Sequence, residues 1–120
     1  MAVTELQSTT DLTPIVNDFC MTVCTVNGSG SATANSIIYR ALFQMGIPVS
    51  GKNIFPSNIM GMATWFVIRV NEEGFTGRVS HDDIVVAMNP STLLYETSFL
   101  PEGGVIFYAD HIMIPDGHRE

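Results

Sequence analysis

The sequence predicts an α/β fold of the Rossmann-like type, with a mostly parallel sheet and a hairpin at one edge. An apolar run at 19–26 stops at a Gly-Ser-Gly-Ser turn and is followed at once by a helical pattern at 31–45. Two further short apolar runs, at 83–88 and 105–109, are separated by a helical segment. Strands that alternate with helical connections favour a parallel sheet.

The first strand is expected to be buried on both faces, because β-branched and apolar residues fill it without a clear polar alternation. Its apolar members are Phe19, Met21, Val23 and Val26. Cys20 and Cys24 lie in the same strand, about 13 Å apart at about 3.3 Å per residue. They cannot bridge to each other at that distance, so we expect two buried, reduced thiols.

The helix that follows has apolar residues at steps of three and four, which predict one stripe that faces the sheet. The stripe consists of Ala34, Ile37, Ile38, Ala41, Leu42 and Met45. Gly46 and Pro48 are typical of a helix C-terminus. At the N-terminus, the hydroxyl of Ser29 or Ser31 is expected to act as the cap.

The glycine turn between the first strand and the helix is the strongest candidate for a binding site. Glycines let the backbone approach a ligand closely, while the first helical amides and the helix dipole favour an anion. We expect a phosphate group there, held by Asn27, Gly28, Ser29, Gly30 and Ser31. The alternative is a turn that only joins strand to helix. Thr33 stands where a dinucleotide fingerprint has its third glycine, and the acidic residue that binds ribose is missing, which argues against NAD.

Lys52, the only lysine of the chain, is a second candidate for this site. It lies in a polar segment at 50–58 that contains glycine and proline, so we expect a loop that returns towards the glycine turn. A lysine there would supply a cation near the phosphate, and a solvated loop lysine is the alternative. The pattern G-x-x-x-x-G-K at 46–52 is not a P-loop, because it follows a helix and is followed by Asn53.

A strand is predicted at 63–70, where the sequence reads Ala-Thr-Trp-Phe-Val-Ile-Arg-Val. The turn residues Asn-Glu-Glu-Gly follow, and then a second apolar segment at 75–79. This order predicts that 63–70 and 75–79 form the edge hairpin.

Polar residues follow three of the predicted parallel strands. Asn27 precedes the glycine turn, Asn89 precedes Pro90 and a short helix, and Asp110 ends the last strand. Ligands of open parallel sheets bind beyond the carboxyl ends of the strands, so Asn89 joins the candidate site. Each of these residues is also an ordinary strand terminator, since Asn and Asp favour turns.

Composition limits the partners of the chain. A net charge of −7 disfavours nucleic acid and acidic membranes, which attract basic surfaces. No apolar run reaches the roughly 20 residues that span a bilayer, and the polar start lacks the features of a signal peptide, so we expect a cytoplasmic protein. The chain is only 14% charged and 46% hydrophobic, whereas soluble domains average about 25% charged, so we expect partner chains that cover apolar surface.

The sequence shows no arrangement typical of catalysis or metal binding. His81, His111 and His118 lack the spacing of metal ligands, and two cysteines are too few for a cluster. Nucleophile elbows and paired carboxylates are missing as well. We therefore expect neither a catalytic residue nor a metal ligand in this chain.

Long collinear blocks of the sequence resemble the gamma domain that opens the alpha subunit of 2-oxoacid:ferredoxin oxidoreductases, especially the 2-oxoglutarate type. The resemblance covers about 17–110. Its main blocks are VNGSGSA at 26–32, NS at 35–36, MGIPVSGKNIFPSNI at 45–59, TW at 64–65, IRVN at 68–71 and AMNP at 87–90.

This resemblance implies a role in the CoA-dependent oxidative decarboxylation of a 2-oxoacid to an acyl-CoA. The gamma domain is associated with CoA, whereas thiamine diphosphate, magnesium and iron-sulfur clusters belong to partner alpha and beta subunits or domains, and ferredoxin accepts the electrons. We expect a flexible segment at 1–16 and a shortened gamma-type domain at 17–120, incomplete relative to the family domain. The alternatives are an assembly module without a ligand and a free NAD-binding domain.

Overall fold

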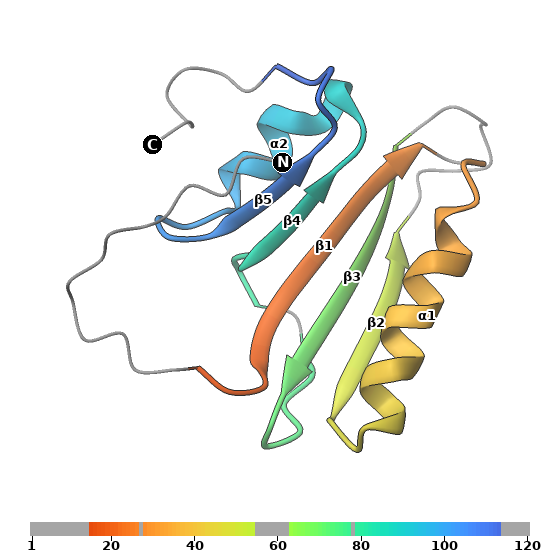
Figure 1. The fold of residues 1–120 in the computed structure, drawn as a ribbon. Coiled ribbons are helices and arrows are strands. Elements are labelled where there is room, and N and C mark those ends of the chain that lie inside the picture. Colours follow the sequence, from red (N-terminus) through yellow and green to blue (C-terminus); the bar gives the residue numbers. More distant parts are fainter. Residues whose placement is uncertain (1–14, 27, 55–62, 78, 114–120) are drawn as a thin grey trace.

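The computed structural model describes residues 15–26, 28–54, 63–77 and 79–113. These residues form one five-stranded sheet in the order β2-β3-β1-β4-β5, with helices on both faces (Figure 1). The strands are β1 (Asp18–Val26), β2 (Val49–Ile54), β3 (Ala63–Asn71), β4 (Ile84–Ala87) and β5 (Val105–Tyr108). The helices are α1 (Ser31–Gln44), the short 3-10 helix η1 (Pro90–Thr92) and α2 (Leu93–Ser98).

The predicted α/β class is confirmed, and the sheet is mixed. β1 pairs in parallel with β4, and β4 in parallel with β5. β3 runs antiparallel to both of its neighbours, β1 and β2. Four strands therefore point in one direction, with β3 reversed between two of them, as the arrowheads in Figure 1 show.

The edge hairpin exists, but the predicted pairing of its strands was wrong. The partner of β3 is β2, whereas Phe75–Gly77 and Val79 lie outside any strand. Asn71 holds the chain in a turn after β3, because its Oδ1 accepts hydrogen bonds from the backbone N–H of Glu73 and of Phe75. The polar residues of β2 predict a loop because an exposed edge strand has the same composition as one.

Burial of β1 on both faces is confirmed. Residues 22–25 are all buried, and so is Cys20. Cys20 and Cys24 are free thiols, as expected. A second apolar cluster lies beside β4, where Val85 and Ala87 pack with Leu93 and Ile112.

The prediction for the buried face of α1 was wrong. Ile37 is 65% exposed and Met45 is 72% exposed, while the buried residue of the helix is Asn35. The ring of Tyr39 lies over Gly51 of β2, where a Cβ would come within 3.0 Å of Tyr39 Cδ2 and 3.1 Å of Phe66 Cζ. A glycine in the edge strand thus lets the helix pack through its aromatic residue, which leaves most of the predicted stripe exposed, with Leu42 half-buried.

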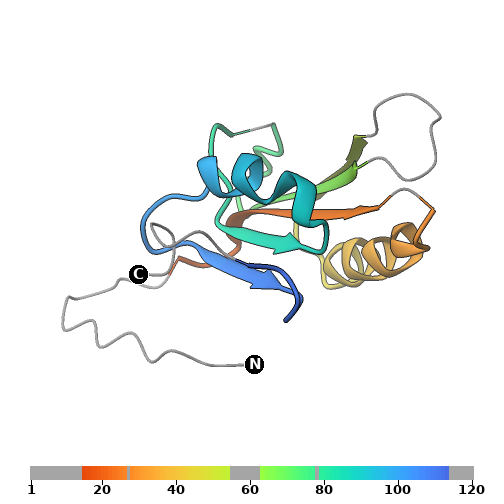
Figure 2. The ribbon, with the colours of Figure 1, turned by 90° about the horizontal axis from the view of Figure 1, so that it is seen from above.

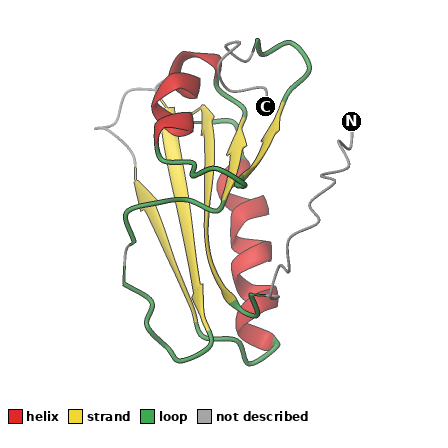
Figure 3. Cartoon of the chain, turned by 90° about the vertical axis from the view of Figure 1, so that its left-hand side faces the viewer, coloured by secondary structure: helices red, strands yellow, loops and turns green. Residues whose placement is uncertain are grey.

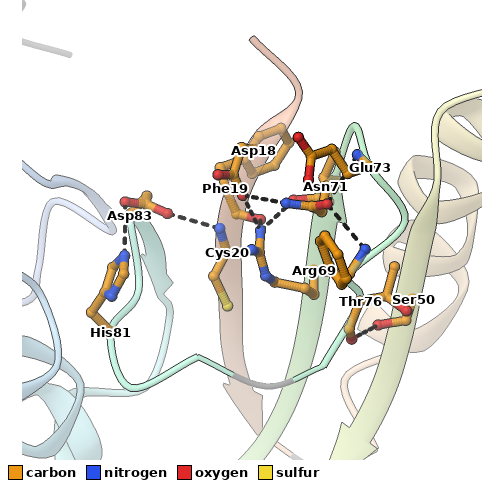
Figure 4. A network of polar contacts seen from close by, with 12 residues as sticks. Asp18, Phe19, Cys20, Ser50, Arg69, Asn71, Glu73, Thr76, His81 and Asp83 are labelled. Carbon is orange, nitrogen blue, oxygen red and sulfur yellow. Dashed lines mark hydrogen bonds and ion pairs between the residues drawn. The ribbon is translucent and has the colours of Figure 1, made fainter. Parts of the chain in front are cut away.

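A polar network joins β1 to its neighbouring strands at the start of β1, which is the end opposite the glycine turn (Figure 4). The Arg69 guanidinium of β3 donates to Asp18 Oδ1 at 2.7 Å and to the carbonyl of Phe19 at 3.1 Å. The bond from Arg69, together with one from Asn71, holds the pKa of Asp18 below its usual value. On the other side of β1, Asp83 Oδ2 accepts from the backbone N–H of Cys20 at 2.9 Å.

The two helices lie on opposite faces of the sheet (Figure 2). Thr25 Oγ1 is hydrogen-bonded to Ser31 Oγ of α1 at 2.6 Å. Cys24 precedes Thr25 in the strand, and its Sγ is hydrogen-bonded at 3.0 Å to Oγ1 of Thr92, the residue just before α2. Because successive side chains of a strand point to opposite faces, these two contacts assign α1 to one face and α2 to the other.

Candidate functional site

The candidate site lies where the parallel neighbours β1 and β4 end. The chain leaves β1 towards α1 on one face and leaves β4 towards η1 and α2 on the other face (Figure 3). Two connections that depart to opposite faces mark a switch point of the sheet, and ligands of open α/β sheets usually bind in a crevice at such a point. We call this position, between the glycine turn at 28–31 and Asn89, the crevice. The glycine turn borders this crevice on the β1 side.

The backbone of the glycine turn is exposed and has the conformation that glycine favours. Gly28 has a φ of 87° and Gly30 a φ of 79°, and both residues are exposed together with Ser29. The turn closes through a hydrogen bond from the N–H of Ser29 to the carbonyl of Val26 at 3.1 Å. Such left-handed positions carry a high cost for a residue with a Cβ, so both glycines are required by the geometry.

Gly30 is the N-cap of α1, so the predicted cap by Ser29 or Ser31 was wrong. No side chain of the described residues caps this helix, and its first turn contains no acidic residue. The hydroxyl of Ser31 is engaged with Thr25 instead. The positive end of the helix dipole is thus presented at the crevice without an acceptor side chain, which is the electrostatic condition for binding an anion.

Asn89 lies at the β4 side of the crevice and serves as the cap of η1. Its Oδ1 accepts from the backbone N–H of Ser91 at 3.0 Å and from Ser91 Oγ at 2.7 Å. The side chain is buried, 5% exposed. These contacts are those of an ordinary strand terminator. They leave Asn89 beside the crevice with its side-chain Oδ1 already engaged in hydrogen bonds.

The structure does not bring Lys52 to the glycine turn in the way the sequence predicted. Lys52 lies in β2 and not in a loop, and β3 separates β2 from β1. It pairs with Val67, which is opposite Thr22 of β1, on the face of the sheet that carries α2. Asn27, the remaining predicted residue, lies outside the described residues.

Sequence reasoning missed the polar groups on the α2 face. The side chain of Glu96 in α2 is buried, and Trp65 Nε1 donates a hydrogen bond to its Oε1. Burial raises the pKa of Glu96 above its usual value and raises the pKa of Cys20 and of Cys24 to about 12, so both thiols stay protonated and unreactive near neutral pH. The sole tryptophan was the one signal in the sequence, because a buried indole N–H requires an acceptor.

Within the described residues, no three His, Cys, Asp or Glu side chains gather in a way that would hold a metal ion. None of the helices described is both long and apolar enough to cross a membrane.

Comparison with known proteins decides the family. The family model described as pyruvate ferredoxin/flavodoxin oxidoreductase matches residues 20–119. The chain belongs to this family. No protein of curated function matches it.

Solved structures of this family share the fold of the chain. The pyruvate oxidoreductase subunit PORC of Thermotoga maritima has a TM-score of 0.67 at 18% identity, over 87% of this chain and 56% of that one. The 2-oxoglutarate:ferredoxin oxidoreductase of Magnetococcus marinus, solved with 2-oxoglutarate, coenzyme A and succinyl-CoA bound, has a TM-score of 0.75 at 20% identity, over 88% of this chain and 19% of that one. The keto/oxoacid ferredoxin oxidoreductase gamma subunit of Geobacter sulfurreducens has a TM-score of 0.67 at 17% identity, over 84% and 57%. The chain therefore spans just over half of two of these proteins and about a fifth of the third.

Proposed function

We propose that this chain is the gamma-domain component of a cytoplasmic 2-oxoacid:ferredoxin oxidoreductase and that its glycine turn binds a phosphate of CoA. The enzyme as a whole converts a 2-oxoacid, 2-oxoglutarate in this proposal, to an acyl-CoA. The observation that carries the proposal is the uncapped N-terminus of α1 behind Gly28 and Gly30, at the crevice between β1 and β4.

The residues of the turn suit a phosphate. Backbone N–H groups at a helix N-terminus donate to phosphate oxygens, and the glycines leave the backbone without a Cβ in the way. An added Cβ at Gly30 would meet no atom within 4 Å, so the space in front of the turn is open to a ligand. The Magnetococcus relative was solved with coenzyme A, which supports CoA as the phosphate carrier.

The remaining chemistry belongs to partners in this proposal. The chain itself would supply binding and assembly, and its two buried thiols would take no part in the reaction, since burial keeps them protonated near neutral pH. Thiamine diphosphate, magnesium and iron-sulfur clusters would be held by thiamine-binding alpha and beta subunits or domains, and ferredoxin would receive the electrons.

The test is CoA binding by the assembled oxidoreductase that carries Gly30→Val. The matched control is Gly74→Val. Gly74 has a φ of 88° and equally open surroundings. It lies shortly after Asn71, which pairs with Asp18 at the end of β1 that is far from the glycine turn. Both variants place a β-branched side chain at a left-handed glycine position, so a difference in CoA binding between them reports on the site. We expect calorimetry to show at least tenfold weaker CoA binding for Gly30→Val and no change for Gly74→Val.

An unchanged CoA affinity in the Gly30→Val enzyme contradicts the assignment of the site. If subunit association weakens in that variant while CoA affinity is kept, the glycine turn meets another subunit and the chain is an assembly module. Gel filtration of the purified subunits separates this result from a loss of CoA binding.

A further inference from the structure

The face of the sheet that carries α2 holds a cavity of about 190 Å³ that the proposed function does not use. Residues of β1, β2, β3 and α2 line it, together with Phe99 and the segment 79–82 before β4. Its lining includes Thr22, Trp65, Asp82, Tyr95, Glu96 and Phe99.

Aromatic rings form much of the wall. The rings of Trp65 and Tyr95 have centroids 6.0 Å apart at an interplanar angle of 62°. Those of Tyr95 and Phe99 are 5.0 Å apart at 68°. Tilted aromatic rings that line one space present both edges and faces to it, and an aromatic face attracts a cation through its quadrupole.

Two carboxyl groups from different elements line the same space. Glu96 comes from α2, is 2% exposed and accepts from the indole N–H of Trp65. Asp82 comes from the segment before β4, and its Oδ1 accepts from Thr22 Oγ1 at 2.8 Å and from Cys20 Sγ at 3.3 Å. These hydrogen bonds fix both carboxyl groups towards the cavity and its walls.

Neither carboxyl group has a cationic partner among the residues that the structure describes. Arg69 forms an ion pair with Asp18, and Nε2 of His81, which also lines the cavity, lies 3.5 Å from Oδ1 of Asp83. Arg40 is exposed on α1, and Lys52 is exposed on the edge strand. A buried carboxylate is costly without a counter-charge, and the residues that the structure describes supply none at this cavity.

We propose that this cavity binds a small organic cation, an alkylammonium or alkylguanidinium group, with its charge between Asp82 and Glu96 and its carbon atoms against the aromatic rings. A cavity of about 150 Å³ holds benzene, so the volume suits a group of this size. The source is either a free amine or a lysine or arginine side chain of a partner chain, because both present the same chemistry.

Other ligands suit the cavity less well. An anion would be repelled by two carboxyl groups. A hard divalent cation requires about six oxygen ligands, and within the described part of the chain no three His, Cys, Asp or Glu side chains gather to hold one. A purely apolar ligand would leave the carboxyl groups without a counter-charge.

The sole tryptophan of the sequence makes the test direct, since Trp65 fluorescence reports occupancy of the cavity. The full chain is titrated with n-butylammonium and n-butylguanidinium, with n-butanol as the neutral probe of similar size and potassium chloride as the salt control. We expect a saturable fluorescence change with the two cations, confirmed by calorimetry, and none with butanol or salt. Equal binding of butanol, or no binding of either cation, overturns the proposal.

Charge-removing variants provide the second arm. Asp82→Asn and Glu96→Gln keep the shape and the acceptor oxygen of each side chain, and each is expected to weaken cation binding at least tenfold. Asp110→Asn is the matched control, because Asp110 is an exposed carboxylate after β5 and does not line the cavity. Circular dichroism checks that each variant is folded, and folded variants with full affinity refute the proposal.

The same titration on the assembled oxidoreductase identifies the source. Binding that persists in the complex indicates a free amine. Binding by the chain alone that is lost in the complex indicates that a basic side chain of a partner occupies the cavity. Both results support a cation site, and neither depends on whether the glycine turn binds CoA.

Discussion

Replacement of Gly51 by alanine tests how α1, and with it the glycine turn, is held on the sheet. An alanine Cβ at this position would lie 3.0 Å from Tyr39 Cδ2, 3.1 Å from Phe66 Cζ and 3.3 Å from Tyr39 Cε2. These distances are shorter than ordinary carbon contacts of about 3.5–4.0 Å, so the ring of Tyr39 and the helix must move outwards. Overpacking of this kind costs about 1–3 kcal/mol.

The expected net loss is smaller than the steric cost. Replacing glycine by alanine stabilises a compatible site by about 0.4–1 kcal/mol, because the unfolded chain loses freedom. We therefore expect Gly51→Ala to lower the free energy of unfolding by about 1–2 kcal/mol. For a domain of this length that corresponds to a fall in Tm of about 4–8 °C, measured by thermal and urea unfolding followed by circular dichroism.

Two comparisons make the test specific. Gly77→Ala is the control, because a Cβ there meets no atom within 4 Å, and it is expected to leave stability unchanged or to raise it slightly. In a Tyr39→Ala background the cost of Gly51→Ala is expected to fall by about 1 kcal/mol, since two of the three close contacts disappear. If Gly51→Ala costs the same in both backgrounds, or no more than Gly77→Ala, the described packing of α1 is refuted.

Three further predictions concern buried groups. Glu96→Gln is expected to raise the free energy of unfolding at pH 7. Burial raises the pKa of the Glu96 carboxyl in the folded state, so the stabilisation that its protonated form gives is present at low pH and is lost as pH rises through that pKa. A difference of one between the pKa values of the folded and unfolded states is worth about 1.4 kcal/mol. Urea unfolding measured at several pH values would show a free energy of unfolding that depends less on pH in the variant. Cys20 and Cys24 are expected to resist a thiol reagent at pH 8 until urea unfolds the chain, because burial raises the pKa of both to about 12; rapid reaction in the native state would contradict this. Leu93→Ala is expected to cost about 2–5 kcal/mol in urea unfolding, since the side chain is 4% exposed in the cluster beside β4, and a loss below about 1 kcal/mol would contradict that packing.

Long-range contacts explain the predictions that were wrong. The buried stripe of α1 is turned from the predicted one towards Asn35 and Tyr39, so that Ile37 and Met45 are exposed, and the absence of a side chain at Gly51 makes room for Tyr39. The polar neighbours of Lys52 in the sequence predict a loop, whereas pairing with β3 makes the segment an edge strand. Glu96 was overlooked because a glutamate in a short helix has the pattern of an exposed surface residue.

The sequence by itself determined the features that depend on neighbouring residues: the buried run of β1, the left-handed glycines that follow it, the start of α1 directly after them, and two thiols too far apart along one strand to bridge. Only the tertiary structure decided which face of α1 meets the sheet, that β3 is reversed between β2 and β1, and that Asp82 and Glu96 line one cavity. The physical reason is that turn geometry and periodicity arise within a few residues, whereas burial, strand pairing and the balance of charge depend on side chains that are distant in the sequence and meet only in the folded chain.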